Sequence, residues 1–283
     1  MEGHKQFVII GGGKMGEAIL SGWLASESSP ADSIDHLDIV VVEPGIDRCE
    51  YLEGSYAVAS VTDVSEIYPA DKPDVVVLAV KPQVMMEVLK SISSEEVFQG
   101  GADGPLFVSI AAGLTTDRLL SGLPDDAPLV RVMPNMPLMV GEGASGVCGS
   151  ATSSAAQVDY VAALFGCLGR AVVVDEADMD AVCAVSGSGP AYVAAMIEAL
   201  REAGVECGLD AEMAETLALQ TVLGTAQLID DTGMAPEELR KAVCSPGGTT
   251  LAALDAMYAA GFNEVFDAGV KAAVRRSKEL AKS

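Results

Sequence analysis

The sequence predicts an α/β fold, with an N-terminal doubly wound sheet domain over residues 1–175 and an all-α C-terminal domain over residues 176–283. Three observations lead to this prediction. Apolar runs alternate with helical patterns in the first part of the chain, a glycine-rich turn follows the first apolar run, and the alternation stops after Val174. Alternating strands and helices are typical of a mostly parallel sheet covered by helices on both faces.

The expected strands are short runs rich in Val and Ile. Several are almost continuously apolar, which is typical of parallel strands buried on both faces. We expect seven of them: Phe7–Ile10, Asp38–Val42, Tyr56–Val61, Asp74–Val80, Leu106–Ala111, Leu129–Val132 and Ala171–Val174.

Beyond Asp175 the chain is rich in Ala, Leu, Met and Glu at helical spacing, and clusters of Gly and Pro separate the helical stretches. Wide apolar faces on these helices leave two explanations open, an internal core or a dimer interface. The expected helices are Met179–Val185, Ala191–Ala203, Ala211–Asp230, Ala235–Val243, Thr250–Ala260 and Val265–Ala281.

Charge and composition exclude several classes of function. Seventeen basic against 41 acidic residues give a net charge of −24, which disfavours nucleic acid and anionic lipid as partners. No stretch approaches the roughly 18 apolar residues that a membrane span needs, and no signal peptide precedes Phe7. We therefore expect a cytoplasmic protein.

Cysteines and histidines narrow the chemistry further. The six cysteines are scattered without a C-x-x-C pair, which indicates reduced thiols and no metal site. The two histidines, His4 and His36, lie in polar surroundings near the N-terminus. Catalysis by a Ser–His or Cys–His pair is therefore improbable, and a cofactor is expected to carry the chemistry.

The clearest motif is G-x-G-x-x-G, formed by Gly11, Gly13 and Gly16 between an apolar strand and an apolar helix. In this context the glycines allow a tight turn, a close approach to a pyrophosphate and close packing of helix on strand. The helix start also offers free N–H groups to phosphate. A purely structural turn is the alternative. The loop residues expected to bind a dinucleotide are Gly11, Gly12, Gly13, Lys14 and Met15.

The second expected strand ends at Glu43, where dinucleotide folds place an acid on the adenine ribose. The spacing from the glycines exceeds the usual ~20 residues, and the polar stretch Ser26–Asp35 accounts for the excess as an insertion. A carboxylate there would repel a 2′-phosphate, so Glu43 favours NADH over NADPH. Nearby Arg48 argues the other way, and a solvated surface Glu43 is the alternative.

Further cofactor neighbours are expected at the carboxyl ends of the next strands, because ligands of doubly wound sheets bind there. The fourth strand runs into Lys81-Pro-Gln and the fifth into Ala-Ala-Gly. These ends supply Ala79, Val80, Lys81, Pro82, Ala111 and Ala112.

A second anion-binding motif precedes the apolar helix in the C-terminal half. In Ser245-Pro-Gly-Gly-Thr-Thr250 the glycines leave backbone N–H groups open, and Thr249 or Thr250 is a natural N-cap. Such a nest suits a small carboxylate. An ordinary capped turn is the alternative.

Together the motifs resemble the Δ1-pyrroline-5-carboxylate reductase family nearly from end to end. The resemblance covers the glycine loop, Ala79–Gln83, Val108–Gly113, Arg131–Pro137 with Gly141–Ser145, Ser186–Tyr192, Ala242–Thr250 and Arg276–Leu280. Met136 and Lys14 depart from the family, which more often has Thr and Asn at these positions.

The resemblance implies a Rossmann-type domain followed by a dimerisation domain, and homodimers that assemble further, commonly into decamers. The substrate would be a cyclic imine carboxylate, reduced with NADPH or NADH to L-proline. Thr250 would bond the ring nitrogen as the catalytic residue, and Asn135 would join the cofactor site. The implied substrate-binding residues are Glu176, Ser245, Gly247, Gly248, Thr249 and Thr250.

Two other readings stay open. A β-hydroxyacid dehydrogenase relative shares the two-domain plan but needs a catalytic lysine, and Lys241 is the only lysine between Val174 and Val270. A non-catalytic NAD(P)H-binding or redox-sensing protein would keep the glycine loop without needing Ser245–Thr250.

Overall fold

The computed structural model describes residues 5–28, 30, 34–68 and 72–281. His4 and part of the Ser26–Asp35 stretch lie outside this set. The chain divides into two compact units, Met1–Ser188 with Ala273–Ser283, and Gly189–Ala272. The predicted boundary after residue 175 stays a prediction.

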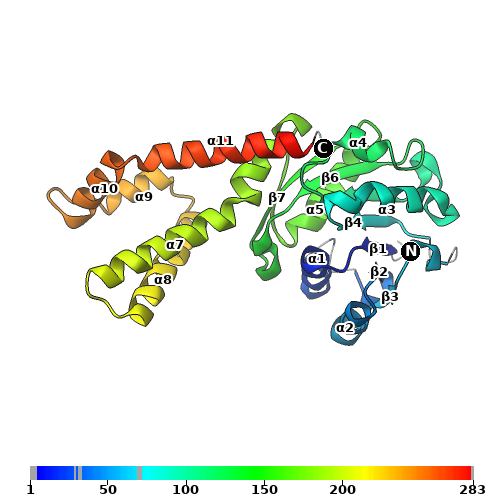
Figure 1. The fold of residues 1–283 in the computed structure, drawn as a ribbon, viewed down its shortest axis with the longest axis horizontal. Helices are drawn as coiled ribbons and strands as arrows, with labels where there is room; N and C mark the ends of the chain where they lie inside the picture. Colours follow the sequence, from blue (N-terminus) through cyan, green and yellow to red (C-terminus); the bar gives the residue numbers. More distant parts are fainter. Residues whose placement is uncertain (1–4, 29, 31–33, 69–71, 282–283) are drawn as a thin grey trace. The chain divides into compact units, whose positions relative to one another are not determined.

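The first unit contains an eight-stranded sheet of order β3-β2-β1-β4-β5-β6-β7-β8, drawn in Figure 1. Strands β1 to β6 are mutually parallel, β7 runs antiparallel to β6, and β8 is parallel to β7. The strands are β1 (Phe7–Ile10), β2 (Ile39–Val42), β3 (Ala59–Val61), β4 (Val75–Leu78), β5 (Leu106–Ser109), β6 (Leu129–Met133), β7 (Gly143–Gly149) and β8 (Gly169–Val173).

All seven predicted strands are present, mostly shorter than expected, and β7 was missed. Its sequence, Gly-Ala-Ser-Gly-Val-Cys-Gly, has only one β-branched residue. Glycine and alanine are depleted in strands, so local propensity gave no signal. Pairing on both sides, with β6 and β8, makes the segment a strand.

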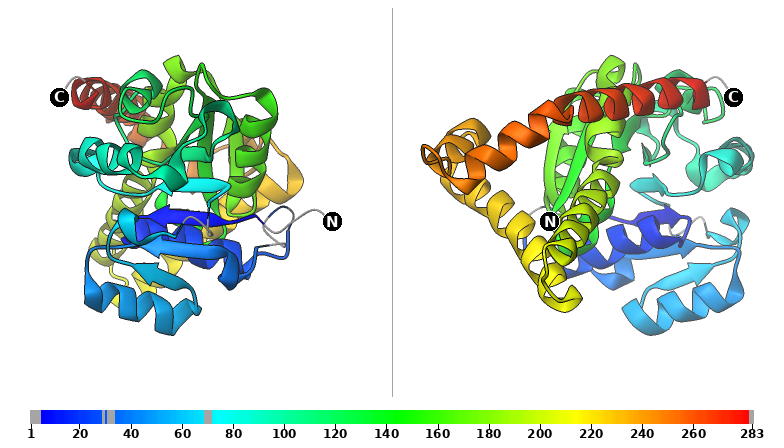
Figure 2. Two further views of the ribbon diagram at one scale, coloured as in Figure 1. Left: turned by 90° about the vertical axis from the view of Figure 1, so that its right-hand side faces the viewer. Right: turned by 60° about the vertical axis from the view of Figure 1, so that its left-hand side comes forward.

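Helices cover both faces of the sheet, as the doubly wound prediction requires. One face packs against α1 (Lys14–Ala25), α2 (Ile46–Tyr56) and α5 (Ala155–Gly166), around the buried Trp23. The other face packs against α3 (Pro82–Ser94) and α4 (Thr116–Leu120). In Figures 1 and 2, α3 and α2 lie on opposite sides of strands β1 to β3.

The second unit is all helical, as predicted, and its first two helices pack on each other. It contains α7 (Gly189–Glu206), α8 (Ala211–Thr232), α9 (Pro236–Ala242), α10 (Thr249–Ala259) and most of α11 (Phe262–Leu280). Many large apolar side chains on these helices are exposed, including Leu217, Leu223 and Val265.

A five-residue π-helix, Cys183–Gly187, links α6 (Met179–Val182) to the start of α7. The Ser188 N–H donates to the Cys183 carbonyl at 2.8 Å, and a hydrogen bond across five residues is typical of a π-helix. The predicted helix Met179–Val185 is therefore α-helical up to Val182 and continues as the wider π-helix, which runs into the motif that begins with Ser186.

One helical stretch of the described chain, Glu176–Glu206, is long and apolar enough to cross a membrane, with a mean hydropathy of 1.2. The expectation that no stretch is apolar enough was wrong, because this helix reaches the required mean hydropathy with small and polar residues between its apolar ones. Only 6% of its most apolar window is buried within the chain. Length and composition alone are weak evidence for a membrane span.

Candidate dinucleotide and carboxylate sites

Most of the predicted dinucleotide residues lie at the carboxyl ends of the central strands. There β1 and β4 are neighbours and the strand order reverses. Backbone bonds hold the strand ends together there. The Gly11 N–H donates to Val42 over 2.8 Å, and the Ala79 N–H donates to Ile10 over 2.8 Å. Such a switch point is where doubly wound folds bind ligands.

The glycine loop has the geometry that a dinucleotide requires. Gly11 has φ +109°, and a Cβ there would lie 2.8 Å from the Ala79 backbone. A Cβ on Gly16 would lie 2.0 Å from the Gly11 carbonyl oxygen, whereas one on Gly13 would meet no atom within 4 Å. The turn and the helix packing are therefore tight, while the loop is open at Gly13, which fits a pyrophosphate.

Glu43 closes the loop from the side of β2. Its carboxylate accepts the Gly12 N–H at 2.9 Å and the Gly45 N–H at 3.1 Å. A carboxylate has about four acceptor positions, so this arrangement leaves capacity for ribose hydroxyls. Glu43 thus lies where the sequence placed it, and the structure adds the backbone bonds that orient it.

Arg48, in the first turn of α2, is bonded within the protein. Its Nε–H donates to the Gly12 carbonyl oxygen at 2.6 Å, and its guanidinium pairs with Glu17 of α1. The sequence gave no signal for this pair, because Glu17 and Arg48 belong to different helices that tertiary packing brings together.

The remaining predicted cofactor residues surround the same edge. Lys14 is exposed at the start of α1, Met15 packs against the core, and Lys81 is the N-cap of α3 with Pro82 as its first residue. Ala79 and Val80 lie beside Gly11, whose added Cβ would touch both. Ala111 is buried just beyond β5, followed by the partly exposed Ala112.

Asn135 has a structural task that the sequence did not reveal. Its Oδ1 accepts the Ala144 N–H at 2.8 Å, and its Nδ2 donates to the Ser186 carbonyl at 3.1 Å. The side chain is buried and joins the end of β6 to β7 and to the π-helix. Its predicted role in cofactor binding remains a prediction.

Glu176 also bonds inside the first unit. Its carboxylate accepts the Thr116 N–H at 2.6 Å and the Thr116 hydroxyl, and it pairs with Arg131 at 3.2 Å. Burial, reinforced by Glu176, raises the pKa of the neighbouring Cys148 thiol to about 11. Cys148 is therefore a neutral thiol at physiological pH, and the substrate role of Glu176 stays a prediction.

The predicted carboxylate site lies in the second unit, immediately before α10. Gly247 has φ +71°, and a Cβ on Gly248 would lie 2.4 Å from the Ser245 Oγ. Gly248, rather than a threonine, is the N-cap, so the expected Thr249 or Thr250 cap was wrong. Thr249 and Thr250 instead begin the helix, where the first N–H groups have no intrahelical acceptor.

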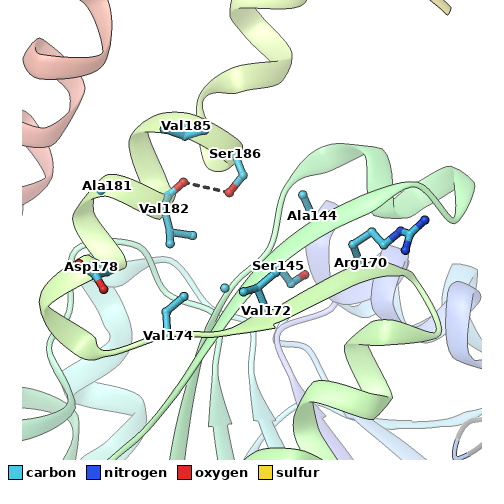
Figure 3. A pocket seen from close by; sticks show the side chains of 11 residues that line it. Ala144, Ser145, Arg170, Val172, Val174, Asp178, Ala181, Val182, Val185 and Ser186 are labelled. Carbon is cyan, nitrogen blue, oxygen red and sulfur yellow. Dashed lines mark hydrogen bonds between the residues drawn. The ribbon is translucent and has the colours of Figure 1, made fainter. Parts of the chain in front are cut away.

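A hollow of about 420 Å³ lies along the exposed edge strand β8 (Figure 3). Apolar side chains of β8 and the helical stretch after it form most of its lining, with Arg170 and Asp178 as its charged members. The apolar members include Val172, Val174, Val182 and Val185. It has none of the predicted site residues.

Comparison with known proteins identifies the family of the chain. Residues 176–280 match the family described as pyrroline-5-carboxylate reductase dimerisation, and residues 6–113 match the one described as NADP oxidoreductase, coenzyme F420-dependent. A pyrroline-5-carboxylate reductase of Synechocystis is 44% identical over 277 residues, covering 98% of each chain. The chain belongs to the pyrroline-5-carboxylate reductase family.

Solved reductase structures share the whole fold. One from Coxiella burnetii has a TM-score of 0.89 at 33% identity, covering 99% of this chain and 100% of its own. One from Plasmodium falciparum, with NADP bound, has a TM-score of 0.82 at 28% identity and 98% coverage of both chains. Membership of this family confirms the predicted Rossmann-type domain, dimerisation domain and enzyme class.

Proposed function

We propose that the protein reduces 1-pyrroline-5-carboxylate to L-proline with a reduced nicotinamide dinucleotide. The Ser245–Thr250 loop carries the proposal, because the first turn of α10 offers backbone N–H groups and the Thr250 hydroxyl. The Gly248 N–H is not among these groups, since it donates to the Ser245 carbonyl at 3.0 Å. A small carboxylate with an adjacent nitrogen matches these groups. The glycine loop and the full-length relatives named as this reductase support the same reaction.

The residues of the chain bind and orient the substrate. The N–H groups at the start of α10 hold the carboxylate, assisted by Ser245, and the Thr250 hydroxyl faces the ring nitrogen. When bound, the reduced nicotinamide supplies a hydride to C5 of the ring. The nitrogen gains its proton from solvent or arrives protonated, so orientation is the main contribution of the protein to the rate.

Two replacements of Thr250 test this role. Thr250→Val removes the hydroxyl at similar volume, and we expect kcat/KM for the imine to fall about 10²-fold, the scale of a lost transition-state hydrogen bond. Thr250→Ser keeps the hydroxyl and should stay within about fivefold of the parent, a difference near 1 kcal/mol. The dissociation constant of NADH should be unchanged in both variants.

Steady-state oxidation of NADH and NADPH, with and without the imine, is the assay. Absence of imine-dependent turnover with both cofactors would refute the reaction. Equal losses in Thr250→Val and Thr250→Ser, or a parallel loss of NADH binding, would refute the role of the hydroxyl.

For the cofactor, we propose a preference for NADH. The Glu43 carboxylate is fixed beside Gly12 and Gly45 at the end of β2. A 2′-phosphate placed there would meet a like charge, whereas ribose hydroxyls would meet an acceptor. The wild-type protein should show a larger kcat/KM with NADH than with NADPH, and Glu43→Gln should reduce that ratio. A wild-type preference for NADPH would refute this proposal.

Assembly is the third part of the proposal. The match to the dimerisation family covers the helices whose apolar side chains are exposed in the single chain. We propose that a second copy covers these helices and the hollow beside β8, whose helical lining belongs to the same matched region. Light scattering on the purified protein measures the mass of the assembly and so also tests the predicted decamer. A monomer at micromolar concentration would refute the assembly.

We also propose that the protein is cytoplasmic and that neither nucleic acid nor a membrane is its partner. A net charge of −24 and six free cysteines support it. A second copy packed on the apolar stretch Glu176–Glu206 would account for its composition. Fractionation of cells into soluble and membrane parts tests the location.

A further inference from the structure

A charged cluster lies between α1 and α2, directly behind the glycine loop. The Glu17 carboxylate accepts hydrogen bonds from the Tyr51 hydroxyl at 2.9 Å and from the Tyr56 hydroxyl at 2.9 Å. It also pairs with the Arg48 guanidinium. Three donors from α2 therefore converge on one carboxylate of α1.

Arg48 is fixed from three sides. Besides Glu17, its Nε–H donates to the Gly12 carbonyl oxygen at 2.6 Å. Its guanidinium carbon lies 4.8 Å from the centroid of the Tyr51 ring, within the range of a cation–π contact. The side chains of Arg48 and Glu17 are 30% and 18% exposed, so solvent screens the pair only in part.

Glu17 and Arg48 are both ionised at neutral pH. Burial opposes ionisation of Glu17, but hydrogen bonds from Arg48, Tyr56 and Tyr51 outweigh it and lower the pKa of Glu17. The hydrogen bond to Glu17 raises the pKa of Arg48. The pair therefore persists as carboxylate and guanidinium.

The position of the pair matters because the backbone of Gly12 connects it to Glu43. The Gly12 N–H is bonded to Glu43 and the Gly12 carbonyl to Arg48. Glu43 and Glu17 together contribute two negative charges against one positive charge on Arg48. An arginine near this strand end is the residue that NADP-binding folds use for the 2′-phosphate. Here its charge is already matched.

We propose that Glu17 is a specificity-determining residue, which pairs with Arg48 and so withholds the guanidinium from a 2′-phosphate. This inference rests on the proposed binding of a nicotinamide dinucleotide at the glycine loop. It deepens the preference for NADH, since Glu43 repels the phosphate and Glu17 removes the cation that would compensate. The bonds of Tyr51 and Tyr56 hold Glu17 in that position.

The test uses two probes that differ by one phosphate, 5′-AMP and adenosine 2′,5′-bisphosphate, with binding measured by calorimetry on the full chain. In Glu17→Gln the released Arg48 should strengthen bisphosphate binding about tenfold, which corresponds to ~1.4 kcal/mol. Binding of 5′-AMP should change less than twofold. The ratio of kcat/KM for NADPH to that for NADH should rise in parallel.

Two controls separate this effect from a change in net charge or folding. Glu50→Gln removes one negative charge from the exposed side of α2 and should alter neither probe. Glu17→Gln combined with Arg48→Gln should lose the tenfold gain, because the gain comes from Arg48. Glu17→Ala serves as the second variant if Glu17→Gln has a lowered melting temperature.

The outcomes are distinct. The inference is overturned if Glu17→Gln and Glu17→Ala leave bisphosphate binding unchanged, or if Glu50→Gln or the double variant shows the same gain. The wild-type ratio of NADH to NADPH tests the proposed cofactor preference separately. Failure of the wild type to bind either probe would instead refute the dinucleotide site itself.

Discussion

Alanine replacements at Gly13 and Gly16 should separate the two tasks of the glycine loop. A Cβ on Gly16 would lie 2.0 Å from the Gly11 carbonyl oxygen, which is 1.4 Å short of an ordinary contact at 3.4 Å. Because this neighbour is backbone, α1 must move away from the β1 end. A Cβ on Gly13 would meet no atom within 4 Å, and its φ of −69° suits alanine.

These distances set the expected magnitudes. Overpacking of this size costs about 3 kcal/mol, and the higher helix propensity of alanine returns about 1 kcal/mol. Gly16→Ala should therefore lose ~2 kcal/mol of unfolding free energy, which lowers the melting temperature by about 4–8 °C. Gly13→Ala should stay within ~0.5 kcal/mol of the parent.

Cofactor binding should respond most directly to the Gly13 replacement, which leaves stability unchanged. In Gly13→Ala the methyl group occupies the open side of the loop, so NADH affinity should fall at least about tenfold, or ~1.4 kcal/mol, without loss of stability. Thermal unfolding and a fluorescence titration with NADH measure both quantities. The loop geometry is wrong if Gly16→Ala is as stable as the parent, or if Gly13→Ala binds NADH normally.

Three further predictions concern the surrounding polar groups. Glu176→Gln should lower the unfolding free energy by about 1–3 kcal/mol at neutral pH, because it leaves the buried Arg131 guanidinium without its counter-charge; equal stability in urea titrations would contradict this. Asn135→Ala should lower the unfolding free energy by about 1–3 kcal/mol, because the Ala144 N–H and the Ser186 carbonyl lose their hydrogen bonds. Asn135→Asp keeps only the acceptor and should recover part of this loss in the same urea titration. Burial, with a contribution from Glu17, raises the pKa of Tyr56 from 10.0 to about 12. The stabilisation from neutral Tyr56 is therefore complete below pH 10 and is lost as the pH rises toward 12. Tyr56→Phe should remove ~1 kcal/mol of this alkaline destabilisation after allowance for solvent screening, and identical pH profiles for parent and variant would contradict the assignment.

The sequence alone determined the class of fold and located two loops that are expected to bind anions. Strand periodicity and the helical second half are local patterns, since burial on one or two faces dictates which residues repeat. The glycine loop and Ser245–Thr250 are also local, because a turn followed by a helix start needs its glycines and hydroxyls within a few residues. The strands and helices lie near their predicted positions, apart from β7 and the N-cap of α10, and ligand binding at the two loops stays a prediction.

Only the tertiary structure decided which polar groups pair. Glu17 and Arg48 are 31 residues apart, and Thr116 and Glu176 are 60 apart. Nothing in the spacing of such residues indicates contact, because the sheet order and the packing of α1 on α2 set their distance. Strand β7 also depends on long-range packing, because its glycine-rich sequence forms a strand by pairing with β6 and β8. Local pattern thus specified where ligands are expected to bind, and long-range packing specified the charges that surround them.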